Sequence, residues 1–234
     1  MIIVRITSGL GNQMFQYAFY QLMKERYQDT TVKADITWFN GNKEHQGYEL
    51  ERIFGQREKH VSSGSKFLIE EASTAQILRV TGKIPCFMKG RIAKKFESFR
   101  RYPNRILKIF NEKRLRSYQI YEQEFCNPDT PGHLHPNDLF EKVMHLDTSK
   151  DWYLAGFWIE EAYYKTRISD IQKHFVFPRI TDKENMEWVK KIQSTNSVSI
   201  HVRRGDYLTS YATDFIALSK DYYQAAIAYI CQHV

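Results

Sequence analysis

The sequence predicts an α/β fold built from doubly wound, Rossmann-like domains. Residues 2–6, IIVRI, form a short continuous apolar run, as expected for a strand buried on both faces of a parallel sheet. A glycine turn follows, and residues 12–27 then carry apolar side chains at helical spacing, with Asn12 as the expected N-cap. A second strand expected at residues 32–36 completes a βαβ unit, the building block of such sheets.

The alternation of strand and helix returns further along the chain. Residues 152–158 are typical of a buried strand, and residues 160–175 of a helix that ends before Pro178. We expect a further helix at 181–192, a strand at 197–202 and a closing helix at 221–234. Between these parts, residues 56–150 are less regular and predict helices with a long surface connection.

The polar stretch Gln193-Ser194-Thr195-Asn196 marks the expected domain boundary. Residues 1–193 then form an N-terminal Rossmann-like domain with a basic helical insertion, and residues 194–234 begin a second domain. Because about 40 residues are too few for a doubly wound domain, we expect the second domain to be truncated in this chain.

Composition places the chain among ordinary globular proteins. It has 234 residues, of which 42% are hydrophobic and 26% charged. The longest apolar run, 225–231, is shorter than the ~20 residues that span a bilayer. The chain opens directly on a strand, and its three cysteines are scattered. We therefore expect a cytoplasmic protein without a signal peptide.

The net charge of +7 comes from one segment. Residues 83–116 hold twelve basic and two acidic residues, a charge of +10, which leaves −3 for the rest of the chain. A solvated helical face is the favoured interpretation. The alternative is peripheral contact with an anionic membrane at its inner face, because apolar and aromatic residues are interleaved with the charges. Nucleic-acid binding is not expected.

The turn between the first strand and the first helix is a candidate anion site. It comprises Gly9, Leu10, Gly11, Asn12 and Gln13. A helix N-terminus there presents unpaired N–H groups, and glycines allow a ligand to come close. The pattern alone is weak, since the third glycine of the dinucleotide fingerprint is missing and its acid would have to be Asp35. A tight turn that needs glycine conformations is the alternative.

The segment from Ser199 to Tyr207 is more specific. Arg203 and Arg204 stand at the end of an expected strand, where α/β sheets bind ligands, and guanidinium groups match phosphate oxygens. A diphosphate that leaves a sugar carbon develops charge that an arginine stabilises in the transition state. Strand alternation puts Arg203 on the same face as His201 and favours it for the phosphate, while Arg204 can pair with Asp206.

Weaker candidates remain beside these two. His133, His135 and Asp138 lie in a loop and make a poor metal site. A general base is left open among Asp35, His45 and Asp206. The aromatic residues Trp152, Phe157 and Trp158 fit a buried core better than sugar stacking.

Two stretches resemble the leading motifs of the α-1,2-fucosyltransferase family. They run from Met1 to Ala18 and from His201 to Tyr207, with weaker family patterns at Tyr48-Glu49-Leu50 and Gly156-Phe157-Trp158. The resemblance implies a GT-B fold, two Rossmann-like domains that face a cleft. It also implies GDP-fucose as donor, a galactose-containing glycan acceptor, inversion, and no metal or other cofactor. The His-x-Arg-Arg-x-Asp pattern is shared with α-1,6- and protein O-fucosyltransferases.

The same resemblance assigns roles to residues. Arg203 would contact the diphosphate, with His201, Arg204 and Asp206 organising the site and Tyr207 among the substrate-binding residues. The turn at residues 9–13 would line the cleft from the facing domain. The chain departs from the family at Ser8, where glycine is usual, and at Ile159, where glutamine often follows the tryptophan. Later family motifs are absent, so a non-catalytic, truncated nucleotide-sugar binding module is the alternative to an active enzyme.

Overall fold

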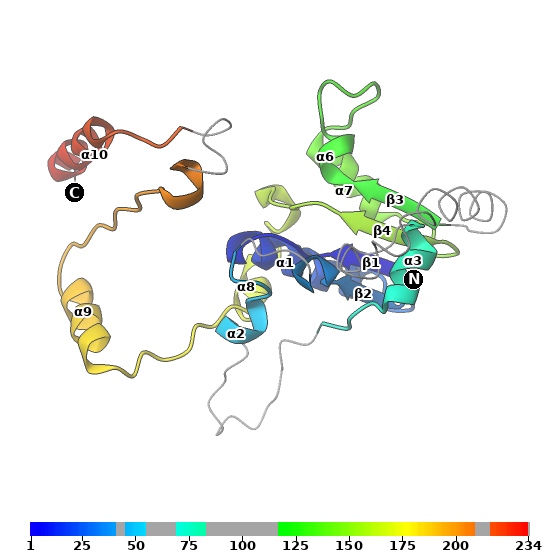
Figure 1. Cartoon of the computed structure of the whole chain (residues 1–234), viewed down its shortest axis with the longest axis horizontal. Coiled ribbons are helices and arrows are strands. Elements are labelled where there is room, and N and C mark those ends of the chain that lie inside the picture. Colours follow the sequence, from blue (N-terminus) through cyan, green and yellow to red (C-terminus); the bar gives the residue numbers. More distant parts are fainter. Residues whose placement is uncertain (41–44, 55–68, 83–116, 209–215, 234) are drawn as a thin grey trace, which may run out of the picture. The chain divides into compact units, whose positions relative to one another are not determined.

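A computed structural model of the chain describes residues 1–40, 45–54, 69–82, 117–208 and 216–233 (Figure 1). The chain divides into two units, Met1–Pro178 and Arg179–Val234. Each unit is described by itself below. The expected functional boundary at residues 193 and 194 stays a prediction.

The first unit is built on a parallel sheet of four strands. These are β1 (Ile2–Arg5), β2 (Val32–Asp35), β3 (Ser117–Tyr121) and β4 (Asp151–Ala155), in the order β2-β1-β4-β3. The central strand β1 pairs with β2 through Ile2 and Val32, and with β4 through Ile2 and Trp152. The α/β fold with a parallel sheet is thereby confirmed, while the two-domain GT-B arrangement stays a prediction.

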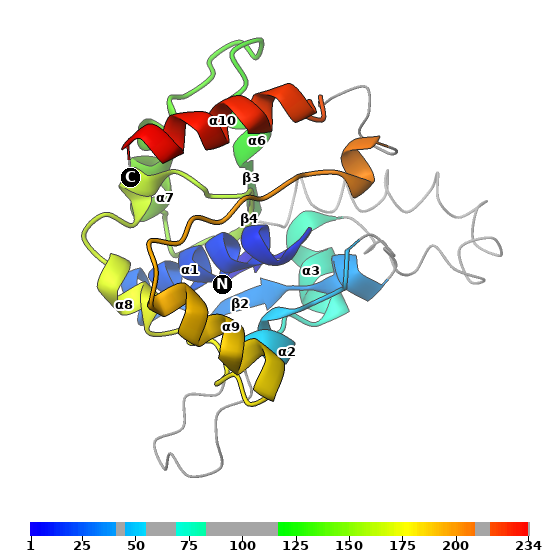
Figure 2. The same ribbon diagram turned by 90° about the vertical axis from the view of Figure 1, so that its left-hand side faces the viewer.

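Alternate strand residues face two different cores. On one face, β1 and β4 contribute Ile2, Val4 and Leu154 to a large cluster with α1 (Leu10–Arg26), α2 (Leu50–Phe54) and α7 (Pro136–Met144). On the other face, Ile3 and Tyr153 pack against α3 (Thr74–Thr81). Figure 2 shows the sheet from a second side, with α1 and α3 labelled. Both strand faces are thus covered, which explains the continuous apolar runs of β1 and β4.

Shorter elements complete the first unit. They are η1 (Thr37–Asn40), α6 (Glu122–Phe125), η3 (Glu161–Tyr163) and α8 (Ile168–Gln172). The single helix expected at 160–175 is therefore wrong. Aromatic anchors interrupt it: the hydroxyl of Tyr163 donates to the carbonyl of Pro136, and that of Tyr164 to the carbonyls of Trp158 and Phe15. These contacts fix the backbone at positions that a continuous helix would not allow.

The second unit contains α9 (Lys183–Gln193), η4 (Gly205–Leu208) and α10 (Lys220–His233). The two α-helices match the expected ones, but residues 197–202 do not form a strand. A strand needs a neighbour for its backbone groups, and the described part of this unit contains no other strand. Val198, Ile200 and Val202 are about half exposed, and none of the unit's described residues is buried.

Two expectations concern membranes. The basic segment 83–116, proposed for membrane contact, lies outside the described residues. In the part of the chain that the structure describes, no helix has the length and apolar character needed to cross a bilayer.

Candidate functional site

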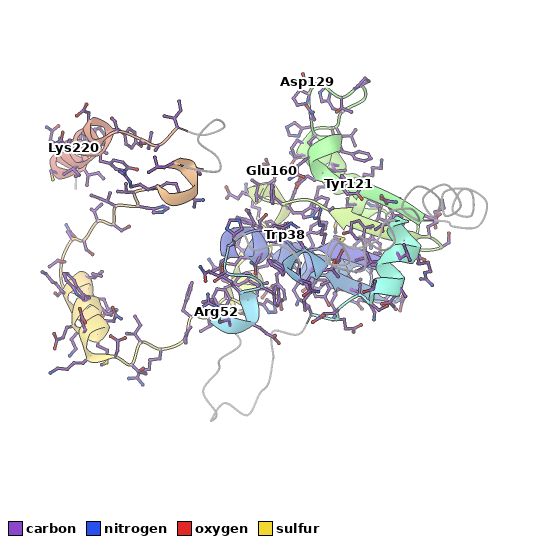
Figure 3. The ribbon with its side chains drawn as sticks, in the orientation of Figure 1. Trp38, Arg52, Tyr121, Asp129, Glu160 and Lys220 are labelled. Atoms are coloured by element: carbon purple, nitrogen blue, oxygen red, sulfur yellow. The ribbon has the colours of Figure 1, made fainter. Side chains whose placement is uncertain are left out.

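The carboxyl ends of four parallel strands define one edge of the sheet, where α/β proteins place ligands. The glycine turn follows β1, η1 follows β2, Glu122 follows β3 and Gly156 follows β4. Figure 3 shows the side chains of this unit, with Trp38, Tyr121 and Glu160 labelled at or after the ends of β2, β3 and β4. Sequence segments far apart in the chain therefore meet at this edge.

The conformation of the turn reassigns the roles of its residues. Gly9 is the N-cap of α1, in place of the expected Asn12, and has φ −76° and ψ 170°, which any residue can adopt. The residue in the left-handed region is Ser8, with φ 67°. The glycines are therefore not required by backbone conformation, so the tight-turn alternative loses its physical basis.

Gly11 instead leaves the start of α1 open, whereas Gly9 allows the ring of His45 to come close. A Cβ on Gly11 would meet no atom within 4 Å, and one on Gly9 would lie 3.3 Å from Nδ1 of His45. The N-cap makes no side-chain hydrogen bond, and the first turn has no acidic residue. Asn12 is partly exposed, whereas Leu10 packs against the core. The first N–H groups of α1 thus lack a side-chain cap, which suits an approaching anion.

Gln13 is fully buried and holds a neighbouring loop in place. Its amide nitrogen donates to the carbonyls of Ser8 (2.8 Å) and Gly47 (2.9 Å), and its oxygen accepts from the N–H of Glu49 (2.9 Å). All three partners are backbone groups. A contribution of Gln13 to ligand binding would therefore act through the loop that it positions.

A second buried amide and a carboxylate fix the turn after β4. Gln16 accepts from the N–H of Thr7 and donates to the carbonyl of Gly156. Glu122 Oε2 accepts from the N–H groups of Phe157 (2.7 Å) and Trp158 (2.8 Å). A Cβ on Gly156 would lie only 2.5 Å from Cβ of Glu122, so this position requires glycine for close approach.

Burial raises the pKa of Glu122 above its ordinary value, more than its two backbone hydrogen bonds lower it, and the nearby Glu160 adds to the rise. A carboxyl group with a raised pKa at the ligand-binding edge was missed by the sequence analysis. Its only signal was position, directly after the third strand.

Asp35 closes the end of β2 and is almost fully buried. One carboxylate oxygen accepts from the hydroxyl of Tyr153 (2.7 Å), and the other from the N–H and hydroxyl of Thr37 (2.9 and 2.7 Å). Burial raises the pKa of Tyr153 well above its ordinary value, and the neighbouring Asp35 adds to this effect. Both carboxylate oxygens of Asp35 thus hold the fold together.

The aromatic residues after β4 belong to the core. Trp152 and Trp158 are buried, and the indole of Trp158 stacks on Phe19 with ring centroids 4.0 Å apart. The favoured prediction, a buried core, is therefore confirmed for these two tryptophans, and the alternative of sugar stacking is wrong for them. Phe157 is only half-buried.

The arginine segment lies in the second unit. His201, Arg203 and Arg204 are exposed, and the Arg203 guanidinium carbon lies 4.7 Å from the ring centre of Tyr207. Gly205 begins η4 with φ 52°, in the left-handed region. The side chain of Asp206 lies outside the described residues. The alternation that separated Arg203 from Arg204 does not apply, since residues 197–202 form no strand; their assignment to a diphosphate stays a prediction.

Metal ligands do not gather in the described ranges, where no three His, Cys, Asp or Glu side chains form a cluster. The expected loop placement is wrong for Asp138, which lies in the first turn of α7. His135 Nδ1 accepts from the N–H of Asn137 and caps the same helix. A pocket of about 330 Å³ lies at the opposite edge of the sheet, where its lining includes Lys24, Tyr27 and Val32.

Comparison with known proteins identifies the family. The profile described as Glycosyl transferase family 11 matches residues 1–234, the whole chain. The chain belongs to glycosyl transferase family 11. The family-11 match includes both the glycine turn and the arginine segment, and it confirms the resemblance inferred from these motifs.

Two Escherichia coli relatives of this family-11 chain are glycosyltransferases. An alpha-1,2-colitosyltransferase is 24% identical over 211 residues, which cover 90% of this chain and 56% of the relative. The O-antigen biosynthesis glycosyltransferase WbnK is 24% identical over 233 residues, or 96% of this chain and 66% of the relative. The family-11 chain thus spans less than two thirds of each relative. No solved structure is significantly similar to it.

Proposed function

We propose that this chain belongs to an inverting glycosyltransferase that transfers fucose from GDP-fucose to the 2-hydroxyl of a terminal galactose in an oligosaccharide or surface glycan. The observation that carries the proposal is the whole-chain membership in glycosyl transferase family 11. Two features support the donor: the uncapped helix start at the carboxyl edge of the sheet, and the paired arginines. Both are suited to a diphosphate.

In this reaction the acceptor oxygen forms a bond with the anomeric carbon of fucose on the face opposite the diphosphate. The bond from that carbon to the diphosphate oxygen breaks, and its electron pair leaves with GDP. The acceptor proton passes to a base or to solvent. Because negative charge grows on the bridging oxygen, a guanidinium group there lowers the barrier more than it stabilises the bound donor.

Arg203 is our choice for that charge, with His201, Arg204, Asp206 and Tyr207 ordering the segment around it. The turn at residues 9–13 would contribute backbone N–H groups and close approach. With the positive charge supplied by arginines, no metal is required for the leaving group. We further propose a cytoplasmic location, with peripheral membrane contact through residues 83–116 as an option.

A second donor deserves a direct test. One relative is named for colitose transfer in an α-1,2 linkage. Nucleotide-activated colitose is therefore the first alternative to GDP-fucose, ahead of an α-1,6 or protein O-linked fucosyl transfer. The other alternative is a binding module that holds the donor without catalysis.

The donor proposal is tested by thermal shift with GDP and by transfer from GDP-fucose and activated colitose to lactose. We expect GDP to raise the melting temperature, and Arg203→Ala to abolish both the shift and the transfer. Arg179→Ala removes the same charge from an exposed position in the same unit and should leave both unchanged. An Arg203→Ala protein that keeps the GDP shift would refute the assigned role, and GDP binding without transfer would favour the binding module.

Gly11→Ala tests separately the effect of the turn on helix stability and its contact with the donor. Because a methyl group at Gly11 meets no protein atom, alanine should stabilise the helix, by less than the about 1 kcal/mol of an interior position, since Gly11 lies in the first turn. If the donor approaches this backbone, the same methyl group should reduce the GDP-induced shift. A stabilised variant with an unchanged GDP shift would remove the turn from the donor site.

A further inference from the structure

Two ring side chains, those of His45 and Trp38, lie beside the glycine turn. The ring of His45 lies over Gly9, with Nδ1 3.3 Å from where a Cβ would stand. The indole of Trp38 follows at 6.4 Å between ring centroids, with an angle of 32° between the two planes. His45 is exposed and Trp38 is half-buried. The two rings therefore form an accessible surface at the ligand-binding edge, which we name the ring wall.

The ring wall is held in place from both ends. Phe39 packs edge-on against Trp38, with centroids 5.1 Å apart at 89°, and is itself packed on the core. The loop that carries His45 is tied to α1 by the buried amide of Gln13, through Gly47 and Glu49. Within this loop His45 has φ 57°, an uncommon conformation for a residue other than glycine. Strain of this kind concentrates at functional sites.

Hydroxyl and amide side chains lie near the ring wall in the sequence. Thr37 and Asn40 stand on either side of Trp38, and Gln46 follows His45. Aromatic rings with hydrogen-bonding side chains nearby suit a ligand with one apolar face and a rim of hydroxyl groups. A pyranose ring has that character. A diphosphate instead requires cations, which the segment with Arg203 and Arg204 offers.

We propose that the ring wall of Trp38 and His45 is the acceptor subsite, which binds a β-galactoside by stacking its apolar face on the rings. This inference rests on the proposed function and adds the place where the acceptor binds. Transfer requires the acceptor hydroxyl to reach the anomeric carbon next to the diphosphate. A subsite that borders the glycine turn meets this requirement, because the same turn is the proposed contact for the diphosphate.

The test measures the binding of methyl β-galactopyranoside and of lactose to the intact chain by calorimetry or ligand-observed NMR, with GDP binding measured separately. Trp38→Ala and His45→Ala are compared with Trp188→Ala, which removes an exposed tryptophan from α9. We expect the first two variants to weaken galactoside binding about tenfold, the equivalent of 1.4 kcal/mol, and to leave GDP binding at the wild-type level. Trp188→Ala should leave galactoside binding unchanged.

Each other outcome has a defined meaning. Galactoside binding that survives both substitutions overturns the inference, as does the absence of galactoside binding by the wild type at millimolar concentration. If the substitutions weaken GDP binding and spare the galactoside, the ring wall holds the nucleotide. Because His45 is exposed, His45→Ala keeps the test valid if Trp38→Ala unfolds. Failure of GDP binding alone would contradict the donor proposal and leave the acceptor subsite standing.

Discussion

Ser8 is the residue whose backbone conformation shapes the glycine turn. It has φ 67°, and its carbonyl accepts a hydrogen bond from the buried amide of Gln13. For a residue with a Cβ, the left-handed region costs roughly 1–2 kcal/mol. The structure thus gives a physical reason why glycine would suit this position better than serine.

Ser8→Gly is expected to stabilise the protein. Relief of the left-handed conformation outweighs the greater freedom of glycine in the unfolded chain, so the free energy of unfolding should rise by about 0.5 kcal/mol. Urea unfolding monitored by circular dichroism measures this change. Ser8→Ala keeps the Cβ and should show no gain; a loss of stability in Ser8→Gly would mean that the serine hydroxyl contributes more than the strain costs.

At this scale the position of the turn could be predicted from the sequence, but the contacts of its residues could not. Spacing and residue type predicted a turn at the glycines and a helix N-cap near them. The three backbone hydrogen bonds of Gln13 could not be predicted, since two of their partners, Gly47 and Glu49, lie more than 30 positions away. Local pattern cannot tell a buried amide that closes loops from an exposed amide that contacts a ligand.

Among the elements, the turn after β4 depends on Glu122, the first residue of α6, which directly follows β3. Glu122 accepts from two consecutive N–H groups there, at the cost of placing its carboxylate in a poorly hydrated position. The folded protein therefore retains the Glu122 proton at pH values where the unfolded chain has released it.

This raised pKa predicts a pH dependence of stability with a definite sign. When the native state binds more protons, stability falls as pH rises, here from the ordinary value of 4.5 up through the raised native pKa. Glu122→Gln lacks this titration. Relative to Glu122→Gln, the wild type should therefore lose stability across that window and then stay level.

Urea unfolding of both proteins on each side of the window measures the difference. The exposed Glu141→Gln serves as the control and should run parallel to the wild type. If the wild type instead gains stability relative to Glu122→Gln as pH rises, burial is not the dominant influence on the pKa of Glu122.

Element prediction succeeded where the determinants are local. The strands at residues 2–6 and 32–36 and the helices near residues 12–27, 181–192 and 221–234 follow from periodicity alone, and each is present within a few residues. The helix at 160–175 failed because Tyr163 and Tyr164 are bound by groups distant in sequence. The strand at 197–202 failed because no described strand of its unit pairs with it.

For the whole molecule, the two units differ in how much they bury. The first has a continuous core on both faces of its sheet, whereas the described residues of the second bury nothing and expose apolar side chains such as Trp188 and Tyr229. Burial of apolar surface is the main source of folding stability. The second unit thus has little stability of its own.

Hydrogen exchange should reveal this contrast. Amides of β1 and α1 should exchange about a hundredfold more slowly than those of α9 and α10, because only the former lie in a packed core. Mass spectrometry of peptides from each element measures the rates. Equal protection in α9 and β1 would show that the second unit acquires a core in solution. The same measurement with GDP added tests whether the nucleotide slows exchange in the second unit.

The strand order carries a consequence for the order of events at the ribosome. β1 is made first, yet its neighbour β4 emerges about 150 positions later, and Gln16 has to wait for the carbonyl of Gly156, 140 residues downstream. At synthesis rates of about 5–20 residues per second, that interval lasts roughly 8–30 seconds. During it the strand that leads into the glycine turn lacks one of its two hydrogen-bonding neighbours, so the backbone groups on that side of β1 pair with water until β4 arrives.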